Sequence, residues 1–145
     1  MIQLYMTVRR EELEMTQGKI IGLQHLAINV TDLEAARVFY GELLGLPELP
    51  RPESVAAQFR SVWYLLGNAE LHVVENPDFQ PLKSPLGPHF AVACDDFAKA
   101  SQRFNDSGAP VMFGPGKGAD GIERIVLKDP TGNVVEVIDL PLHRN

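Results

Sequence analysis

The sequence has very little cysteine and histidine, and it contains no cluster of basic residues. A single cysteine, Cys94, among 145 residues can form neither an intramolecular disulfide nor a Cys-based zinc site, which points to a reducing compartment. Thirteen Lys and Arg stand against 19 Asp and Glu, for a net charge of −6, and this balance argues against nucleic-acid binding. Any metal chemistry is therefore left to carboxylates and the four histidines.

Long apolar runs are also missing. Arg9, Arg10 and Glu11 interrupt the first nineteen residues, so these contain neither a signal-peptide core nor a membrane span of about 20 apolar residues. We expect a cytoplasmic protein without membrane contact. Residues 1–19 are predicted to form an N-terminal extension, either disordered or containing a short helix over 7–15, and residues 20–142 a single domain.

Apolar and polar residues alternate over 23–30, which predicts a strand with one apolar face. Thr31 or Asp32 then caps a helix that ends at Gly45. A hairpin is expected over 61–75, with its turn at Gly67-Asn68. The second half of the chain follows the same plan, and its predicted elements are a strand over 89–94, a helix from Asp95 or Asp96 to Gly108, a loop over 114–121, and strands over 122–128 and 134–140.

The chain matches itself at a shift of 64 residues. This shift places His89 on His25, Glu136 on His72 and Arg124 on Arg60. Alternating strands resemble one another at many shifts, so coincidence is the competing interpretation, but it does not explain why rare histidines should coincide. The sequence therefore predicts two related modules, at about 20–80 and 84–142.

The four repeat-related residues His25, His72, His89 and Glu136 suit a divalent metal. Equivalent positions of two modules meet near their common axis, and imidazole and carboxylate ligands fit Zn²⁺, Ni²⁺, Fe²⁺ or Mn²⁺. Each residue alone is more often structural, and metal binding is favoured only when the four are taken together. We read His143, which lies outside the repeat, as solvent-exposed.

Three further residues are weaker candidates for substrate binding. The guanidinium groups of the repeat-related Arg60 and Arg124 suit a substrate carboxylate or phosphonate. The alternative interpretation is that each is an exposed arginine on a strand. Trp63 is either a wall of the site or a core aromatic residue.

Several segments together resemble the vicinal oxygen chelate superfamily, which includes glyoxalase I, extradiol ring-cleaving dioxygenases and bleomycin-binding proteins. The segments are Leu23–Leu33 continuing into Phe39-Tyr40 and Leu44-Gly45, Leu71–Glu75, His89–Val92, and Asp129–Asn133 followed by Glu136. The resemblance covers about residues 20–140. It implies an α+β fold in which two βαβββ modules form a cupped mixed sheet, with helices on the outer face.

The resemblance also implies a function. One divalent metal would be bound at His25, His72, His89 and Glu136, and homodimers are common, sometimes with the site built across chains. His72 stands where bacterial glyoxalase I carries a carboxylate, which leaves Glu136 as the catalytic base. We expect a glyoxalase-like, metal-dependent lyase or isomerase acting on a small carbonyl or hydroxy-carbonyl substrate. The alternatives are an Fe(II) extradiol dioxygenase, for which His25, His89 and Glu136 form the facial triad, and a drug- or toxin-sequestering protein without catalysis.

Overall fold

The computed structural model describes residues 18–84 and 87–141. The predicted helix over 7–15, most of the predicted N-terminal extension and His143 lie outside these ranges.

The first module is built around a four-stranded sheet with strand order β1-β4-β3-β2. Its elements are β1 (His25–Val30), α2 (Leu33–Ala36), the π-helical segment η1 (Arg37–Leu43), β2 (Glu48–Leu49), α3 (Glu53–Ala56), β3 (Ser61–Leu66) and β4 (Ala69–Glu75). Of the two predicted capping residues, Asp32 begins α2, because its carboxylate accepts hydrogen bonds from the N–H groups of Glu34 and Ala35. Gly45, at φ +73°, takes the left-handed conformation that ends a helix.

The second module repeats this plan with strand order β5-β8-β7-β6. Its elements are β5 (His89–Ala93), α4 (Phe97–Asp106), β6 (Val111–Lys117), β7 (Glu123–Lys128) and β8 (Val134–Ile138). In both modules the first strand pairs in parallel with the last, and the remaining pairs are antiparallel. The predicted α+β fold of two βαβββ modules is confirmed.

The structure corrects the prediction of a loop over 114–121. Strand β6 extends through Lys117 and pairs with β7, with two register shifts between Val111 and Gly116. Pro115 and the glycines around it are typical of a loop, but an irregular edge strand tolerates them, so the sequence did not indicate the strand. The short elements β2 and α3 were likewise not predicted.

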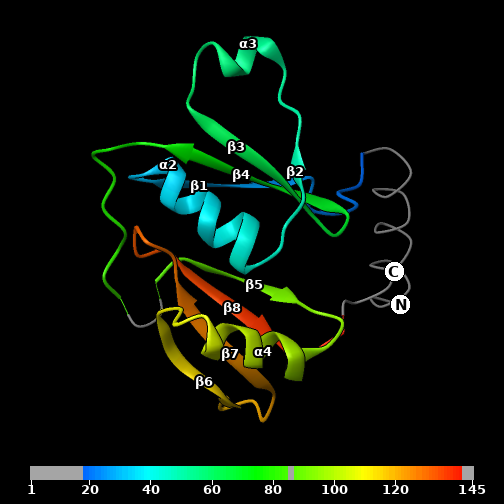
Figure 1. Cartoon of the computed structure of the whole chain (residues 1–145). Helices are drawn as coiled ribbons and strands as arrows, with labels where there is room; N and C mark the ends of the chain where they lie inside the picture. Colours follow the sequence, from blue (N-terminus) through cyan, green and yellow to red (C-terminus); the bar gives the residue numbers. More distant parts are fainter. Residues whose placement is uncertain (1–17, 85–86, 142–145) are drawn as a thin grey trace, which may run out of the picture.

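One hydrophobic core joins the two modules. Apolar residues at alternate positions of both sheets are buried together with residues of the helices, and they include Val62, Leu71, Val73, Ile125, Leu127, Val135 and Val137. Figure 1 shows α2 and η1 lying between the sheets, and α4 lying against the second sheet. Because successive strand residues point to opposite faces, the histidine-bearing positions lie on the faces away from this core.

A buried hydrogen bond connects the modules at the turn between β7 and β8. The Tyr40 hydroxyl donates to Asp129 Oδ2 at 2.9 Å, and the two residues are 0% and 3% exposed. Asp129 Oδ1 also accepts from the N–H groups of Thr131, Gly132 and Asn133 at 2.8–2.9 Å. Burial and the neighbouring Asp129 carboxylate raise the pKa of Tyr40, so this hydroxyl keeps its proton and remains a donor.

The first strands of the two modules run in opposite directions. In the view of Figure 1, β1 runs from right to left and β5 from left to right. Their first residues, His25 and His89, therefore lie at opposite ends of the two-sheet assembly.

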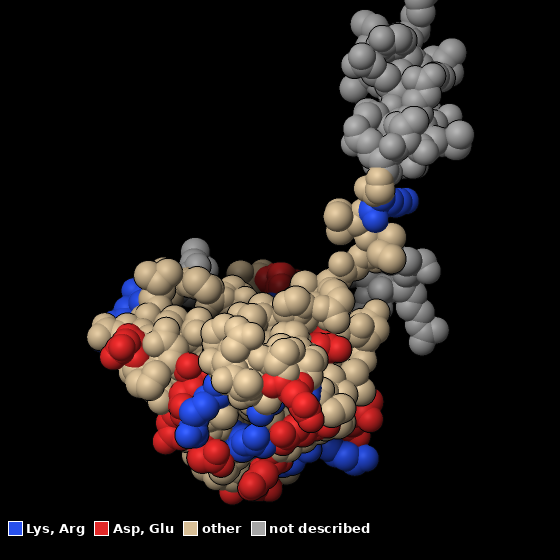
Figure 2. All heavy atoms as spheres, turned by 90° about the horizontal axis from the view of Figure 1, so that it is seen from above, with Lys and Arg blue, Asp and Glu red and all other residues tan. Residues whose placement is uncertain are grey.

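On the face seen from above, basic and acidic side chains intermingle along one edge, and the described residues form no continuous basic patch there (Figure 2). Among the described residues, no helix has both the length and the apolar character needed to cross a membrane.

The Tyr40 hydrogen bond gives a prediction about stability. We expect Tyr40→Phe to lower the free energy of unfolding by about 1–3 kcal/mol, because Asp129 Oδ2 loses a buried donor. Urea denaturation followed by circular dichroism measures the change. Tyr64→Phe, in the same core, is the control and should have a smaller effect, since the structure records no hydrogen bond of its hydroxyl to a described residue. Equal effects of the two substitutions would contradict the assignment.

Candidate metal site

His89 and Glu136 form one half of the candidate site. Glu136 lies on β8 beside Ala91 of β5, two residues beyond His89, so both side chains project from the same face. His89 Nε2 lies 3.8 Å from Glu136 Oε1. The other ring nitrogen, Nδ1, donates to the Gly87 carbonyl at 2.9 Å and thereby directs Nε2 toward the carboxylate.

Arg124 holds the second oxygen of Glu136. Its guanidinium donates to Glu136 Oε2 at 3.3 Å and also pairs with Asp120. The side chains of Arg124 and Glu136 are only 16% and 18% exposed. Hydrogen bonds from the N–H of Ile122 and then from Arg124 hold the pKa of Asp120 below its usual value, so this partner stays ionised.

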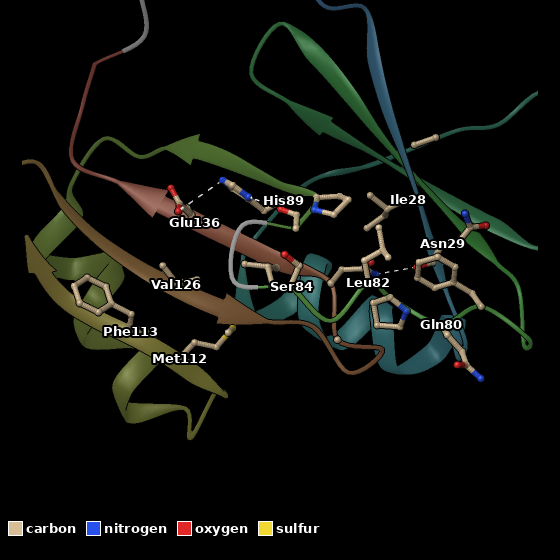
Figure 3. Close-up of a pocket in the computed structure, with 18 residues that line it drawn as sticks. Ile28, Asn29, Gln80, Leu82, Ser84, His89, Met112, Phe113, Val126 and Glu136 are labelled. Carbon is tan, nitrogen blue, oxygen red and sulfur yellow. Dashed lines mark hydrogen bonds and ion pairs between the residues drawn. The ribbon is translucent and has the colours of Figure 1, made fainter. Parts of the chain in front are cut away.

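A pocket of about 530 Å³ opens beside this pair. Figure 3 shows His89 and Glu136 at one side of the pocket, Met112, Phe113 and Val126 along the second sheet, and Ile28 and Asn29 of β1 at the other side. The linker before β5 contributes further lining residues, among them Leu82. The volume lies within the range typical of small-molecule sites.

His25 and His72 form the second half of the candidate site, on the first sheet. His72 lies beside Ala27 of β1, just as Glu136 lies beside Ala91, so the two halves occupy equivalent places in the repeat. The rings of His25 and His72 are stacked with their centroids 4.4 Å apart. On its other face His72 stacks on Trp63, at 3.8 Å and nearly parallel.

Glu70 engages His72 as well. His72 Nε2 donates to Glu70 Oε2 at 2.7 Å, so the nitrogen that most often faces a metal is already occupied. His25 differs, because its Nδ1 contacts the Gln24 side chain and its Nε2 has no recorded partner among the described residues.

Within one chain the two halves stay apart. Among residues 18–84 and 87–141, no group of three or more His, Cys, Asp or Glu side chains is gathered closely enough to hold a metal. Strands β1 and β5 run in opposite directions (Figure 1) and begin at His25 and His89, so the two strands do not begin side by side.

The residues of each half fit a divalent metal to different degrees. Two ligands about 2.1 Å from a tetrahedral ion lie roughly 3.4 Å apart, close to the 3.8 Å between His89 Nε2 and Glu136 Oε1. His25 offers a further nitrogen. His72 fits as a ligand only if its Nε2 leaves Glu70 or its other nitrogen is used.

In this structure the side chains of the three predicted substrate-binding residues contact other side chains of the protein. Arg60 pairs with Glu75 at 2.6 Å, Arg124 pairs with Glu136 and Asp120, and Trp63 stacks on His72. None of the three lines the 530 Å³ pocket. Sequence reasoning missed Glu70 and Asp120, although the alternation that places Glu70 on the same face as His72 was visible in the sequence.

Comparison with known proteins identifies the family. The model of the Glyoxalase/Bleomycin resistance protein/Dioxygenase superfamily matches residues 22–137. The chain belongs to this superfamily.

A curated relative from Synechocystis sp. (strain PCC 6803), named a probable lactoylglutathione lyase, is 28% identical over 123 residues, covering 80% of this chain and 93% of the relative. A crystal structure assigned to the glyoxalase family of Bacillus anthracis aligns with a TM-score of 0.73 and 26% identity, over 87% of this chain and all of that one. A lactoylglutathione lyase from Agrobacterium tumefaciens aligns with a TM-score of 0.64 at 21% identity, over 84% of this chain and 96% of that one, and shares the fold.

The two repeat-related arginines give a matched prediction. We expect Arg124→Met to lower the free energy of unfolding by about 1–3 kcal/mol, because it leaves the mostly buried Glu136 carboxylate without its cation. Arg60→Met is the control. It should lower this energy by less than about 1 kcal/mol, because the Arg60 side chain is 68% exposed and its partner Glu75 keeps a hydrogen bond from the N–H of Leu33. Urea denaturation of both variants tests this, and a larger effect at Arg60 would contradict the ranking.

Proposed function

We propose that this protein is a divalent-metal-dependent enzyme of the glyoxalase type, with lyase or isomerase chemistry on a small carbonyl or hydroxy-carbonyl substrate. The observation that carries the proposal is the His89–Glu136 pair, whose members face each other at 3.8 Å beside a pocket and are each oriented by a second partner. Membership of the superfamily supports it, as does the similarity to a relative named a probable lactoylglutathione lyase.

The proposed metal ligands are His25, His72, His89 and Glu136, with the first two supplied by a second copy of the chain. Each sheet carries two of the four residues on its face away from the core, and the two pairs lie apart within one chain. A homodimer in which the first sheet of one copy faces the second sheet of the other would unite them. A two-fold symmetric pairing creates two such sites at once.

The residues divide the proposed reaction between them. The Glu136 carboxylate accepts the substrate proton, while Arg124 donates to Oε2 and keeps the carboxylate in place. His89 is held by the Gly87 carbonyl, so its Nε2 faces the same point. A divalent metal bound there would supply Lewis-acid polarisation of the substrate oxygens.

One observation favours a second candidate, an Fe(II) extradiol dioxygenase. Glu70 occupies His72 Nε2, which leaves His25, His89 and Glu136 as the residues free to bind a metal. Two histidines and one carboxylate form the facial set that iron oxygenases use. Bound iron together with catechol-dependent oxygen uptake would support this candidate over the lyase.

The metal site can be tested by mixing two inactive variants. We expect wild-type protein purified without chelator or nickel resin to hold close to one divalent metal per chain. His25→Ala/His72→Ala and His89→Ala/Glu136→Ala should each hold less than roughly a tenth of that amount. After a 1:1 mixture is allowed to exchange subunits, about a quarter of the wild-type content should return, because half of the dimers are mixed and each has one intact site. Elemental analysis measures the content.

The mixing experiment separates the possible sites. Metal retained by either double variant at the wild-type level would remove these residues from the metal site. If the mixed dimers recover no metal although the wild-type protein binds it, the whole site lies within one chain. Protein that carries no metal in any form would favour a sequestering role.

Removing the proposed base gives a further prediction. We expect Glu136→Gln to keep the fold and lower kcat by at least about 100-fold, since the amide cannot take up the proton. Turnover is measured with a substrate found by screening carbonyl and hydroxy-carbonyl compounds, and circular dichroism checks the fold. Unchanged turnover would remove Glu136 from the mechanism.

A further inference from the structure

We propose that the pocket beside Glu136 selects a substrate whose chelating oxygens are carried by an uncharged, apolar body, either an aromatic ring or an alkyl chain. This inference rests on the proposed function for the chelating end of the substrate. Such a substrate differs from a conjugate of a peptide thiol such as glutathione, because that conjugate would bring free carboxylates into the site.

The ligand-type residues of the pocket lie at one side, and apolar side chains line much of the rest. His89 and Glu136 lie together at that side, and Leu82, Met112 and Phe113 are among the apolar lining residues (Figure 3). The neutral polar residues Asn29, Gln80 and Ser84 also line the pocket. Ligand sites of this kind bind the apolar body by burial and orient it through a few polar groups.

Three of the lining residues are large, apolar and strongly exposed. Leu82 is 76% exposed, Met112 52% and Phe113 44%. Single exposed apolar side chains are ordinary, but here three surround one cavity, and such clustering marks a binding surface. An apolar ligand body would remove their surface from water, which is favourable.

Apart from the proposed metal, the described lining of the pocket offers no positive charge. None of its described lining residues is Lys or Arg, and the carboxylate among them is that of Glu136. Arg124, which reaches Glu136 from the same sheet, already pairs with two carboxylates. Lys83 follows Leu82 in the linker but is not among the lining residues.

The neutral polar groups of the pocket are partly engaged. Asn133 uses its side-chain amide on the Asn29 carbonyl and on Asp129, each at 2.8 Å. A ligand carboxylate would therefore lose water without gaining a cation, in a protein of net charge −6. An uncharged body carries no such penalty.

A series of hydroxamates tests the inference, because each has the same pair of chelating oxygens on a different body. The probes are acetohydroxamate, benzohydroxamate, heptanohydroxamate and a heptanohydroxamate that ends in a carboxylate, titrated into the metal-loaded full chain by calorimetry. Each added CH₂ should tighten binding roughly two- to fourfold, so heptanohydroxamate should bind at least about 30-fold more tightly than acetohydroxamate. The terminal carboxylate should weaken heptanohydroxamate at least about tenfold.

Matched variants connect this preference with the pocket. Phe113→Ala should weaken heptanohydroxamate at least about fivefold, because it removes part of the apolar wall, and should leave acetohydroxamate within about twofold. Phe59→Ala is the control, since Phe59 is 55% exposed and does not line the pocket. It should leave both affinities within about twofold, and size-exclusion chromatography checks that the variants keep the wild-type oligomeric state.

The outcomes separate this inference from the proposed function. The inference is overturned if affinity does not depend on the body of the probe, if the terminal carboxylate improves binding, or if no probe binds measurably. It is also overturned if Phe113→Ala weakens binding only together with a change of oligomeric state. Heptanamide, which lacks the chelating pair, is titrated in parallel into untreated and into chelator-treated protein. If heptanamide and heptanohydroxamate bind equally to untreated protein and the preference for the longer body persists, the metal function fails and the apolar selectivity stands.

Discussion

The two-residue alternation of the strands is the constraint on which this molecule depends. One face of each sheet enters the common core, where Leu71 and Val135 are fully buried. The other face is then free to carry His72 on one sheet and Glu136 on the other. A one-residue shift of register in either sheet would exchange these faces, bury the ligand-type side chains and expose the core. Fold and candidate site therefore have the same physical origin.

Much of the fold could be predicted from the sequence, because local signals determine it. Alternation located β1, β3, β4, β5, β7 and β8. The predicted helix starts, at Thr31 or Asp32 and at Asp95 or Asp96, agree with the structure, where Asp32 and Asp96 make the capping hydrogen bonds. The strand β6 was missed because it contains Gly114, Pro115 and Gly116, which interrupt any alternating pattern. Its pairing with β7 is a tertiary effect that no short window of sequence contains.

The candidate site could be predicted only in part. The repeat predicted that His25, His72, His89 and Glu136 meet near the common axis of the modules. Among the described residues of one chain, the structure brings together His25 with His72 and His89 with Glu136 and gathers no larger group. How the two modules sit against each other depends on the packing of α2 and η1 between the sheets, which a repeat does not encode. The ion pairs of the two arginines could not be predicted from the sequence either. In the structure Arg60 pairs with Glu75, and Arg124 pairs with Asp120 and Glu136. In this structure both arginines therefore pair with the protein's own carboxylates, and no arginine or lysine is among the described residues that line the nearby pocket.

The Tyr40–Asp129 hydrogen bond makes the two halves of the chain non-interchangeable. The 64-residue shift places Tyr40 on Phe104 and Asp129 on Leu65, so the bond has no counterpart on the other side of the pseudo-symmetry. A chain assembled from two first modules would contain the tyrosine without its acceptor. One assembled from two second modules would bury Asp129 without the tyrosine hydroxyl, and its carboxylate would keep only the donors of its own turn. The bond therefore forms only when a first module packs against a second module.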